Sequence, residues 1–144
     1  MQLRAAILRP GAIEPLVFEQ DADPRAIHLA AYRATQLAGC ASAYPSTAQP
    51  WWPGHRPEHP WQMRGVATWP WARGAGCGRA LVSAIEAEAS AAGADALWCN
   101  ARTGVLGFYA ALGYCEVGER FCITGAGPHK RMIKLLGCGA RPAP

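Results

Sequence analysis

The chain has 144 residues, of which 51% are hydrophobic and 17% are charged, so it fits one folded domain and is not a disordered chain. Twelve arginines and two lysines give a net charge of +4, but they are scattered along the sequence, so no nucleic-acid partner is expected. No apolar run is long enough to span a bilayer, and Met1-Gln2-Leu3-Arg4 lacks a secretory signal pattern, which favours a cytoplasmic protein with no membrane partner.

Hydrophobic periodicity and turn residues predict two helices, three strands, a helix, a strand, a helix and two strands. In chain order these elements cover residues 2–9, 14–20, 26–32, 37–44, 61–68, 78–92, 96–99, 103–112, 114–121 and 129–136. The proline-rich stretch 45–60 is expected to be a loop without regular structure. The wholly apolar run 96–99 is typical of a central strand that is covered on both faces.

A glycine-rich loop separates the predicted strand 61–68 from the predicted helix 78–92. It reads Arg73-Gly74-Ala75-Gly76-Cys77-Gly78-Arg79, and such a loop turns backbone N–H groups toward an anion at a helix N-terminus. A dinucleotide fingerprint would need glycine at position 79 or 81, where the chain has Arg79 and Leu81, and no Walker sequence follows. The remaining pattern, Arg-x-x-Gly-x-Gly, indicates either a phosphate-bearing cofactor or a glycine-rich turn before an ordinary helix.

This loop resembles the acetyl-CoA pyrophosphate loop of the GNAT N-acetyltransferase superfamily, and further segments are similar to its glyphosate N-acetyltransferase type. These segments are Ile7-Leu8-Arg9-Pro10, Gln62-Met63-Arg64-Gly65-Val66-Ala67-Thr68, Leu97-Trp98-Cys99-Asn100-Ala101-Arg102-Thr103, Phe108-Tyr109-x-x-Leu112-Gly113-Tyr114 and Gly127-Pro128-His129. The resemblance implies one α/β (α+β) domain over residues 1–144, with a central mixed, mostly antiparallel sheet and flanking helices. The family's first strand is expected to be missing, which leaves an exposed sheet edge or reflects a truncated start.

The resemblance also implies acetyl-CoA as the co-substrate. Backbone groups at the end of the strand 61–68 would contact the pantetheine and the thioester oxygen where that strand splays from its neighbour. The alternative is that the backbone hydrogen bonds between the two strands continue without a break. The glycine-rich loop would hold the pyrophosphate. The expected cofactor-binding residues are Val66, Ala67, Thr68, Arg73, Gly74, Ala75, Gly76, Cys77, Gly78, Arg79 and Asn100.

Two residues are candidates for base and acid catalysis. His129 opens the last predicted strand, and a neutral imidazole can accept a proton from an ammonium near neutral pH. Tyr109 lies on the predicted helix 103–112, where its phenol could give a proton to the departing sulfur. The resemblance assigns these roles. Without it, His129 reads as a turn residue after Gly-Pro and Tyr109 as a core tyrosine beside Phe108.

Three arginines, Arg9, Arg64 and Arg102, indicate the class of acceptor. Each ends or interrupts an apolar segment, and the planar guanidinium suits bidentate binding of carboxylate, phosphate or phosphonate. Arg102 also follows the carboxyl end of a central strand, the usual ligand crevice of an open α/β sheet. Taken singly, Arg9 could cap a helix and Arg64 could face solvent, but all three fall on segments that match the family.

No metal site is expected. His55 and His59 have H-x-x-x-H spacing, but the surrounding prolines exclude the helix that would bring both onto one face. The six cysteines include no C-x-x-C pair, and most are expected to be buried thiols. The five tryptophans between residues 51 and 71 lack an accompanying basic run, so a hydrophobic wall or lid is expected from them rather than base stacking.

The sequence therefore predicts an enzyme that transfers acetyl directly from acetyl-CoA to the amine of a small anionic acceptor, such as an acidic amino acid or an aminophosphonate. One alternative is an acetyltransferase for peptide or protein amines, for which an open acidic groove would be expected. A different alternative is an acyl-CoA-binding sensor without catalysis. The chain is expected to act as a monomer or a homodimer.

Overall fold

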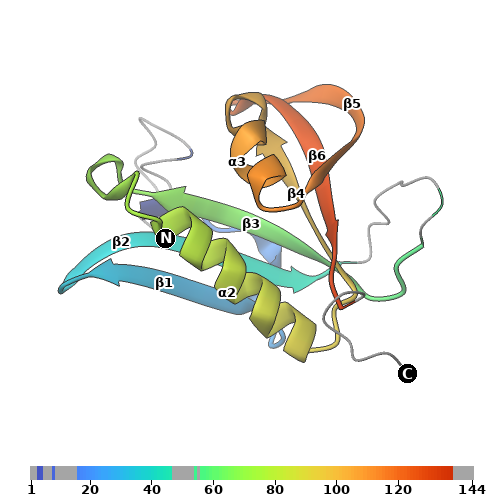
Figure 1. Cartoon of the computed structure of the whole chain (residues 1–144), viewed down its shortest axis with the longest axis horizontal. Coiled ribbons are helices and arrows are strands. Elements are labelled where there is room, and N and C mark those ends of the chain that lie inside the picture. Colours follow the sequence, from blue (N-terminus) through green and yellow to red (C-terminus); the bar gives the residue numbers. More distant parts are fainter. Residues whose placement is uncertain (1–2, 5–7, 9–15, 47–53, 55, 138–144) are drawn as a thin grey trace. The chain divides into compact units, whose positions relative to one another are not determined.

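Six strands form one mixed sheet in the described part of the chain, with the order β1-β2-β3-β4-β6-β5 (Figure 1). The computed structural model describes residues 3–4, 8, 16–46, 54 and 56–137. The pair β3–β4 is parallel and the pairs β1–β2, β4–β6 and β5–β6 are antiparallel, which confirms the predicted mixed, mostly antiparallel sheet. The elements are η1 (Glu19–Ala22), β1 (Ile27–Arg33), β2 (Gln36–Pro45), β3 (Pro60–Thr68), η2 (Pro70–Ala72), α2 (Cys77–Ala91), β4 (Ala96–Arg102), η3 (Thr103–Val105), α3 (Leu106–Ala111), β5 (Cys115–Ile123) and β6 (Gly127–Leu135).

The chain divides into two compact units, each described by itself. The first unit comprises Met1–Tyr44 and Met63–Glu88, and the second comprises Pro45–Gln62 and Ala89–Pro144. The first unit therefore holds β1 and most of β2, β3 and α2. The second holds β4, β5, β6 and α3, together with the first residues of β3.

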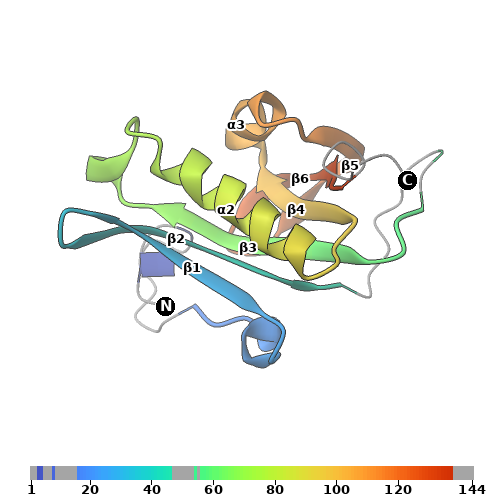
Figure 2. The same cartoon turned by 60° about the horizontal axis from the view of Figure 1, so that its bottom comes forward.

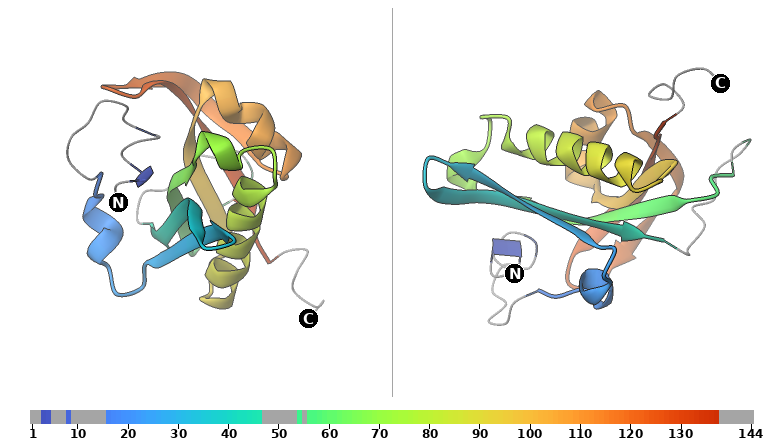
Figure 3. Two further views of the ribbon diagram at one scale, coloured as in Figure 1. Left: turned by 90° about the vertical axis from the view of Figure 1, so that its left-hand side faces the viewer. Right: turned by 90° about the horizontal axis from the view of Figure 1, so that it is seen from below.

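In the first unit, α2 covers one face of the strands and the segment before β1 lies on the other (Figures 2 and 3). Leu81, Val82 and Ile85 recur at helical spacing and are buried, which confirms the predicted amphipathic helix. Gly39 of β2 permits the close approach of this helix. A Cβ at Gly39 would come within 3.0 Å of the Leu81 side chain and 2.8 Å of the Ala67 carbonyl oxygen.

The segment before β1 contains the 3-10 turn η1, and over the described residues 16–20 the short helix predicted for 14–20 is wrong. Phe18 is extended, with φ −99° and ψ 149°. Its backbone N–H donates to the Asp21 carboxylate at 2.8 Å, which starts the turn after Phe18 and keeps Phe18 itself out of a helix. Most residues of the predicted helix 2–9 lie outside the described residues; Leu3, Arg4 and Leu8 are described as helical.

In the second unit, α3 lies against one face of β4 and β6 (Figure 1). Leu97 and Cys99 of β4 are buried, as the apolar run predicts. The end of α3 is tied to the sheet, because the Lys134 ammonium of β6 donates to the Leu112 carbonyl oxygen at 2.8 Å. The helix 103–112 is thus confirmed in place, although its first turn is the 3-10 turn η3.

Two predicted boundaries in the second unit are wrong. β4 continues beyond its apolar run to Arg102, because Asn100 and Arg102 pair with β6 in the antiparallel ladder. The predicted loop 122–128 is a tight turn. The Ala126 N–H donates to the Ile123 carbonyl oxygen at 2.9 Å and Gly125 takes a φ of 78°, so β5 and β6 extend almost to each other.

The cysteines are less buried than predicted. Cys40, Cys77, Cys99, Cys115 and Cys122 are described, all as free thiols, and of these only Cys99 is buried. Cys115 and Cys122 are exposed because β5 is an edge strand. Cys138 lies outside the described residues.

Some predictions for the tryptophans and the loop 45–60 also fall outside the described residues, including Trp51 and Trp52. Trp61 is a buried residue of β3, whereas Trp71 is 49% exposed and is not part of the buried core. Among the described helices, none is both long and apolar enough to cross a membrane.

Candidate active site

The glycine-rich loop between β3 and α2 has the backbone that an anion cradle requires. Gly74 and Gly76 have φ angles of 80° and 84°, a conformation that side chains rarely adopt. A Cβ at either position would meet nothing within 4 Å, so the space above the loop is open. Gly78 differs, because it lies in the first turn of α2 and needs no left-handed backbone.

The N-terminus of α2 supplies donors beside this loop. The Gly76 carbonyl oxygen accepts the first helical hydrogen bond, from the Ala80 N–H at 2.9 Å, so the N–H groups of Cys77, Gly78 and Arg79 have no partner within the helix. The helix is 15 residues long and has no acidic residue in its first turn. Its dipole and free N–H groups therefore favour an anion, and the loop fits a pyrophosphate.

The end of β3 is followed by the 3-10 turn η2 and then by this loop. The parallel ladder joins Pro60–Gln62 of β3 to Ala96–Trp98 of β4. Val66, Ala67 and Thr68 follow the last β3 residue of that ladder. Ala67 is buried and its two neighbours are half-buried.

Tyr109 is a buried residue of α3, 7% exposed, and its ring makes edge-on contacts with Phe108 and Tyr114. Its hydroxyl is hydrogen-bonded to the Cys99 thiol of β4. Burial, with a smaller contribution from Cys99, raises the pKa of Tyr109 well above its ordinary value. Burial also raises the pKa of Cys99 to about 12. Both groups therefore keep their protons at neutral pH, so Tyr109 is available as an acid.

His129 of β6 is 5% exposed and is fixed in one orientation. Its Nδ1 lies 2.7 Å from the Gly127 carbonyl oxygen. Because a carbonyl oxygen only accepts, Nδ1 carries the proton and Nε2 keeps a lone pair in the neutral ring. The ring also stacks on Phe121 of β5, with centroids 6.0 Å apart. This is the tautomer and the restraint that a general base needs.

His129 and Tyr109 lie on opposite faces of the β4–β6 ladder. His129 pairs with Arg102 of β4, so these two side chains share a face. Cys99 lies three residues before Arg102 on the same strand and therefore points to the other face, where it contacts Tyr109. The candidate base thus has an arginine beside it, and the candidate acid lies behind the sheet.

The next row of the ladder, Asn100 and Arg131, lies on the same face as His129 and Arg102. The Cζ of Arg131 lies 4.5 Å from the centre of the Trp98 ring, and its Nε donates to the Asn100 Oδ1 at 3.5 Å. Burial lowers the pKa of Arg131, but a guanidinium keeps its charge at neutral pH. This face of the second unit therefore carries two arginines near His129.

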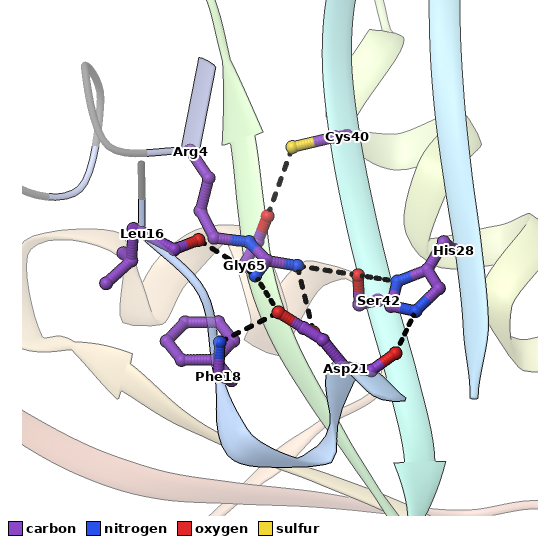
Figure 4. Close-up of polar contacts among 8 residues, drawn as sticks. All are labelled: Arg4, Leu16, Phe18, Asp21, His28, Cys40, Ser42 and Gly65. Carbon is purple, nitrogen blue, oxygen red and sulfur yellow. Dashed lines mark hydrogen bonds and ion pairs between the residues drawn. The ribbon is translucent and has the colours of Figure 1, made fainter. Parts of the chain in front are cut away.

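Arg64 of β3 belongs to the first unit, where its Cζ lies 3.7 Å from the centre of the Phe18 ring. A second arginine, Arg4, lies over the same ring at 4.4 Å. Arg4 is 1% exposed and forms an ion pair with Asp21 at 2.7 Å (Figure 4). Gly65 makes room for it: φ is 67°, and a Cβ there would overlap the Arg4 Nε.

Comparison with known proteins decides the family. The model of the Acetyltransferase (GNAT) family matches residues 4–114, more than half of the chain. The chain belongs to the GNAT acetyltransferase family. It is 35% identical over 136 residues to the uncharacterized N-acetyltransferase YitI of Bacillus subtilis (strain 168), which covers 94% of this chain and 89% of that protein.

Solved structures show the same GNAT fold. An acyl-CoA N-acyltransferase from Pseudomonas aeruginosa has a TM-score of 0.69 at 21% identity, over 92% of this chain and 86% of its own. An aminoglycoside 6'-N-acetyltransferase complexed with coenzyme A has a TM-score of 0.63 at 20% identity, over 88% of this chain and 79% of its own. The predicted fold is thereby confirmed, and so is the predicted class of enzyme, an acyl-CoA-dependent N-acetyltransferase.

The predicted site residues of this GNAT acetyltransferase are divided between its two units. Arg64, the end of β3 and the glycine-rich loop lie in the first unit, whereas Asn100, Arg102, Tyr109 and His129 lie in the second. The second unit brings Arg102 beside His129.

Two of the singled-out residues, Arg9 and His55, lie outside the described residues. His59 is exposed, and its backbone N–H donates to the Asp95 carboxylate at 3.0 Å. The described residues hold no group of His, Cys, Asp or Glu side chains that could bind a metal.

Four residues near the predicted ones were not predicted: Arg4, Phe18 and Asp21 lie near Arg64 in the first unit, and Arg131 lies near His129 in the second. A period of two from His129 would have indicated Arg131, because alternate residues of a strand share a face. Arg4 precedes Leu8 by one helical turn and interrupts an apolar helix face, which is a weak signal for a buried cation. No local pattern indicates Phe18 or Asp21.

Proposed function

We propose that this chain transfers acetyl from acetyl-CoA directly to the amine of a small anionic acceptor, as an enzyme of the glyphosate N-acetyltransferase type. It acts as a single domain in the cytoplasm. Acetyl-CoA is assigned to the backbone of Val66, Ala67 and Thr68, to the loop from Arg73 to Arg79 and to Asn100. Arg9, Arg64 and Arg102 are assigned to the anionic group of the acceptor.

The observation that carries this proposal is the position of His129 beside Arg102. Directly paired residues of neighbouring strands have Cβ atoms roughly 5 Å apart. That spacing suits an amino acid or aminophosphonate, whose amine and anionic group are separated by one or a few bonds. An acceptor held by the Arg102 guanidinium would present its ammonium to the Nε2 of His129.

The chemistry then follows from the protonation states of two side chains. The Nε2 of His129 takes a proton from the acceptor ammonium, and the free amine attacks the thioester carbonyl. The carbon–sulfur bond breaks as the carbon–nitrogen bond forms, and the attacking nitrogen gives its second proton to water, which leaves a neutral amide. The Tyr109 hydroxyl, which burial keeps protonated, gives its proton to the departing CoA sulfur.

The test is release of CoA thiol with purified full-length protein and amines that carry zero, one or two negative groups: glycinamide, glycine and aspartate. We expect turnover to rise with the number of negative groups. Preference for peptide amines would favour the peptide acetyltransferase instead, and acetyl-CoA binding without thiol release from any amine would favour the sensor.

Two arginine variants then assign the acceptor site. Arg64→Ala and Arg102→Ala should each raise the acceptor KM by about one to two decades and leave the KM for acetyl-CoA unchanged. Arg25→Ala is the matched control, because that arginine is exposed and pairs with Asp23 at 2.9 Å. If Arg64→Ala and Arg102→Ala lose acetyl-CoA and keep the acceptor, these arginines belong to the cofactor site and the argument for an anionic acceptor fails.

A further inference from the structure

Arg131 of β6 is a half-buried cation without a counter-ion among the described residues. Its Cζ lies 4.5 Å from the centre of the Trp98 ring, and its Nε donates to the Asn100 Oδ1 at 3.5 Å. Neither partner is an anion, and the N–H donors of Nη1 and Nη2 have no acceptor in the described part of the chain. Burial lowers the pKa of this guanidinium, because no opposite charge offsets the loss of hydration. An anion at Nη1 and Nη2 would offset it.

Trp98 of β4 is a fixed support for this cation. Its side chain is 3% exposed, and β4 lies in the interior of the sheet, between β3 and β6. The indole N–H is buried without a hydrogen-bond partner among the described residues, so packing rather than a polar contact holds the ring. The attraction between a cation and the face of a ring is electrostatic and requires no N–H donor. Trp98 therefore holds Arg131 in place and leaves its Nη donors available for an anion.

Arg131 and His129 share one face of β6, because they are two residues apart on a strand. Their Cα atoms are therefore about 7 Å apart. In the ladder Arg102 lies opposite His129, whereas Trp98 lies opposite Ile133, beyond Arg131. The contact with Trp98 thus draws the Arg131 guanidinium along the strand, away from His129. A group bound at Arg131 must lie farther from the reacting amine than a group bound at Arg102.

We propose that Arg131 binds a second anionic group of the acceptor, several bonds farther from the amine than the group that Arg102 binds. This inference rests on the proposed function, in which Arg102 binds the first anionic group and His129 takes the proton. It names the acceptor class more closely, as a dianion whose second carboxylate or phosphonate stands on a flexible chain, as in glutamate. An acceptor with one anionic group leaves Arg131 without a counter-ion and binds more weakly.

Glutamate and glutamine test the second group, because they differ only in the side-chain carboxylate and amide. In the full-length wild type, the KM for glutamate should be about ten- to a hundredfold lower than the KM for glutamine. Arg131→Met removes the charge and keeps an unbranched side chain. It should raise the KM for glutamate to that for glutamine, and leave the KM values for glutamine and acetyl-CoA within about twofold of wild type.

Lys130→Met is the matched control, because it removes one positive charge from the neighbouring position. The Lys130 side chain points to the other face of β6, where its Nζ lies 3.7 Å from the Glu116 carboxylate. This variant should keep the preference for glutamate. The inference is overturned if the preference survives Arg131→Met or is lost in Lys130→Met. It is also overturned if Arg131→Met raises the KM for aspartate as much as the KM for glutamate, since the second carboxylate of aspartate is closer to the amine.

Nuclear magnetic resonance follows binding apart from catalysis, in the presence of CoA, which carries no acetyl group. The Nε–H signal of Arg131 is assigned by its loss in Arg131→Met. It should move on titration with glutamate and stay in place with glutamine, whose one carboxylate is adjacent to the amine. Absence of movement with glutamate, or equal movement with both, overturns the inference. If the signal moves only with glutamate but wild type acetylates no anionic amine, the proposed function fails while the anion site at Arg131 stands.

Discussion

Replacing Arg4 with methionine should destabilise the fold strongly, because it leaves a carboxylate buried without its cation. Arg4 donates to Asp21 at 2.7 Å, to Ser42 at 2.8 Å and to the Leu16 carbonyl oxygen at 3.2 Å. The Asp21 side chain is only 8% exposed. Removing one partner of a buried ion pair costs about 3–5 kcal/mol. At roughly 2–4 °C per kcal/mol for a chain of this size, the Tm should fall by roughly 6–20 °C.

The pH dependence of this loss has a definite sign. Burial raises the pKa of Asp21, but hydrogen bonds from Arg4 and from the Phe18 N–H outweigh it, so the pKa lies below 3.8. In wild type, the ionised carboxylate therefore contributes stability above about pH 4 and loses it as the pH falls further. In Arg4→Met the burial remains and the bonds from Arg4 are gone, so the pKa of Asp21 rises. Protonation then relieves the buried charge, and the difference in unfolding free energy between the two proteins should shrink on acidification.

Urea unfolding of both proteins at about pH 7 and about pH 5 measures these differences. Adding Asp21→Asn to Arg4→Met should recover part of the lost stability, because the amide carries no charge. A loss below about 1 kcal/mol at both pH values, with no recovery from Asp21→Asn, would refute the burial of this ion pair.

Four further variants test the site and the core. Gly78→Val should weaken acetyl-CoA binding much more than it lowers the stability of the fold, since this glycine lies in a helical turn and needs no left-handed backbone. An unchanged affinity for acetyl-CoA in calorimetric titration would contradict the phosphate cradle. His129→Ala should lower kcat by about two to four decades and leave acetyl-CoA affinity intact; near wild-type turnover removes His129 from the mechanism. Tyr109→Phe should keep the fold and lower kcat by about two decades. Because burial raises the pKa of Tyr109, the kcat of wild type should not fall as the pH rises to about 10. Such a fall would contradict a phenol that stays protonated. Tyr44→Phe should raise the unfolding free energy by about 1 kcal/mol, since the Tyr44 hydroxyl is buried without a hydrogen-bond partner among the described residues. Burial raises the pKa of Tyr44 to about 12, so wild type should also lose stability as the pH rises from about 10, and the variant should lose less; a destabilised Tyr44→Phe would show that the hydroxyl is bonded after all.

Elements set by local patterns could be predicted from the sequence. The buried stripe Leu81, Val82 and Ile85 follows from helical periodicity, and the hairpin of β1 and β2 follows from two β-rich runs around a polar turn. Glycines at positions 74 and 76 take the left-handed backbone that a cradle loop needs. In these cases neighbouring residues carry the whole signal.

Contacts between residues far apart in sequence could not be predicted. Arg4 binds Asp21 and Ser42, which lie 17 and 38 residues away, and nothing in the sequence near Arg4 indicates either partner. The error at residues 16–20 has the same origin, because the Asp21 carboxylate holds the Phe18 N–H outside a helix. β4 was predicted too short because cross-strand pairing, rather than hydrophobicity, extends it to Arg102.

The sheet between His129 and Tyr109 governs how protons enter and leave during turnover. In the proposed mechanism His129 gains a proton on one face while Tyr109 loses one on the other, so no proton passes between them. Each residue must then be restored by its own supply of water. Tyr109 is 7% exposed and His129 is 5% exposed, so only a small part of each side chain meets solvent.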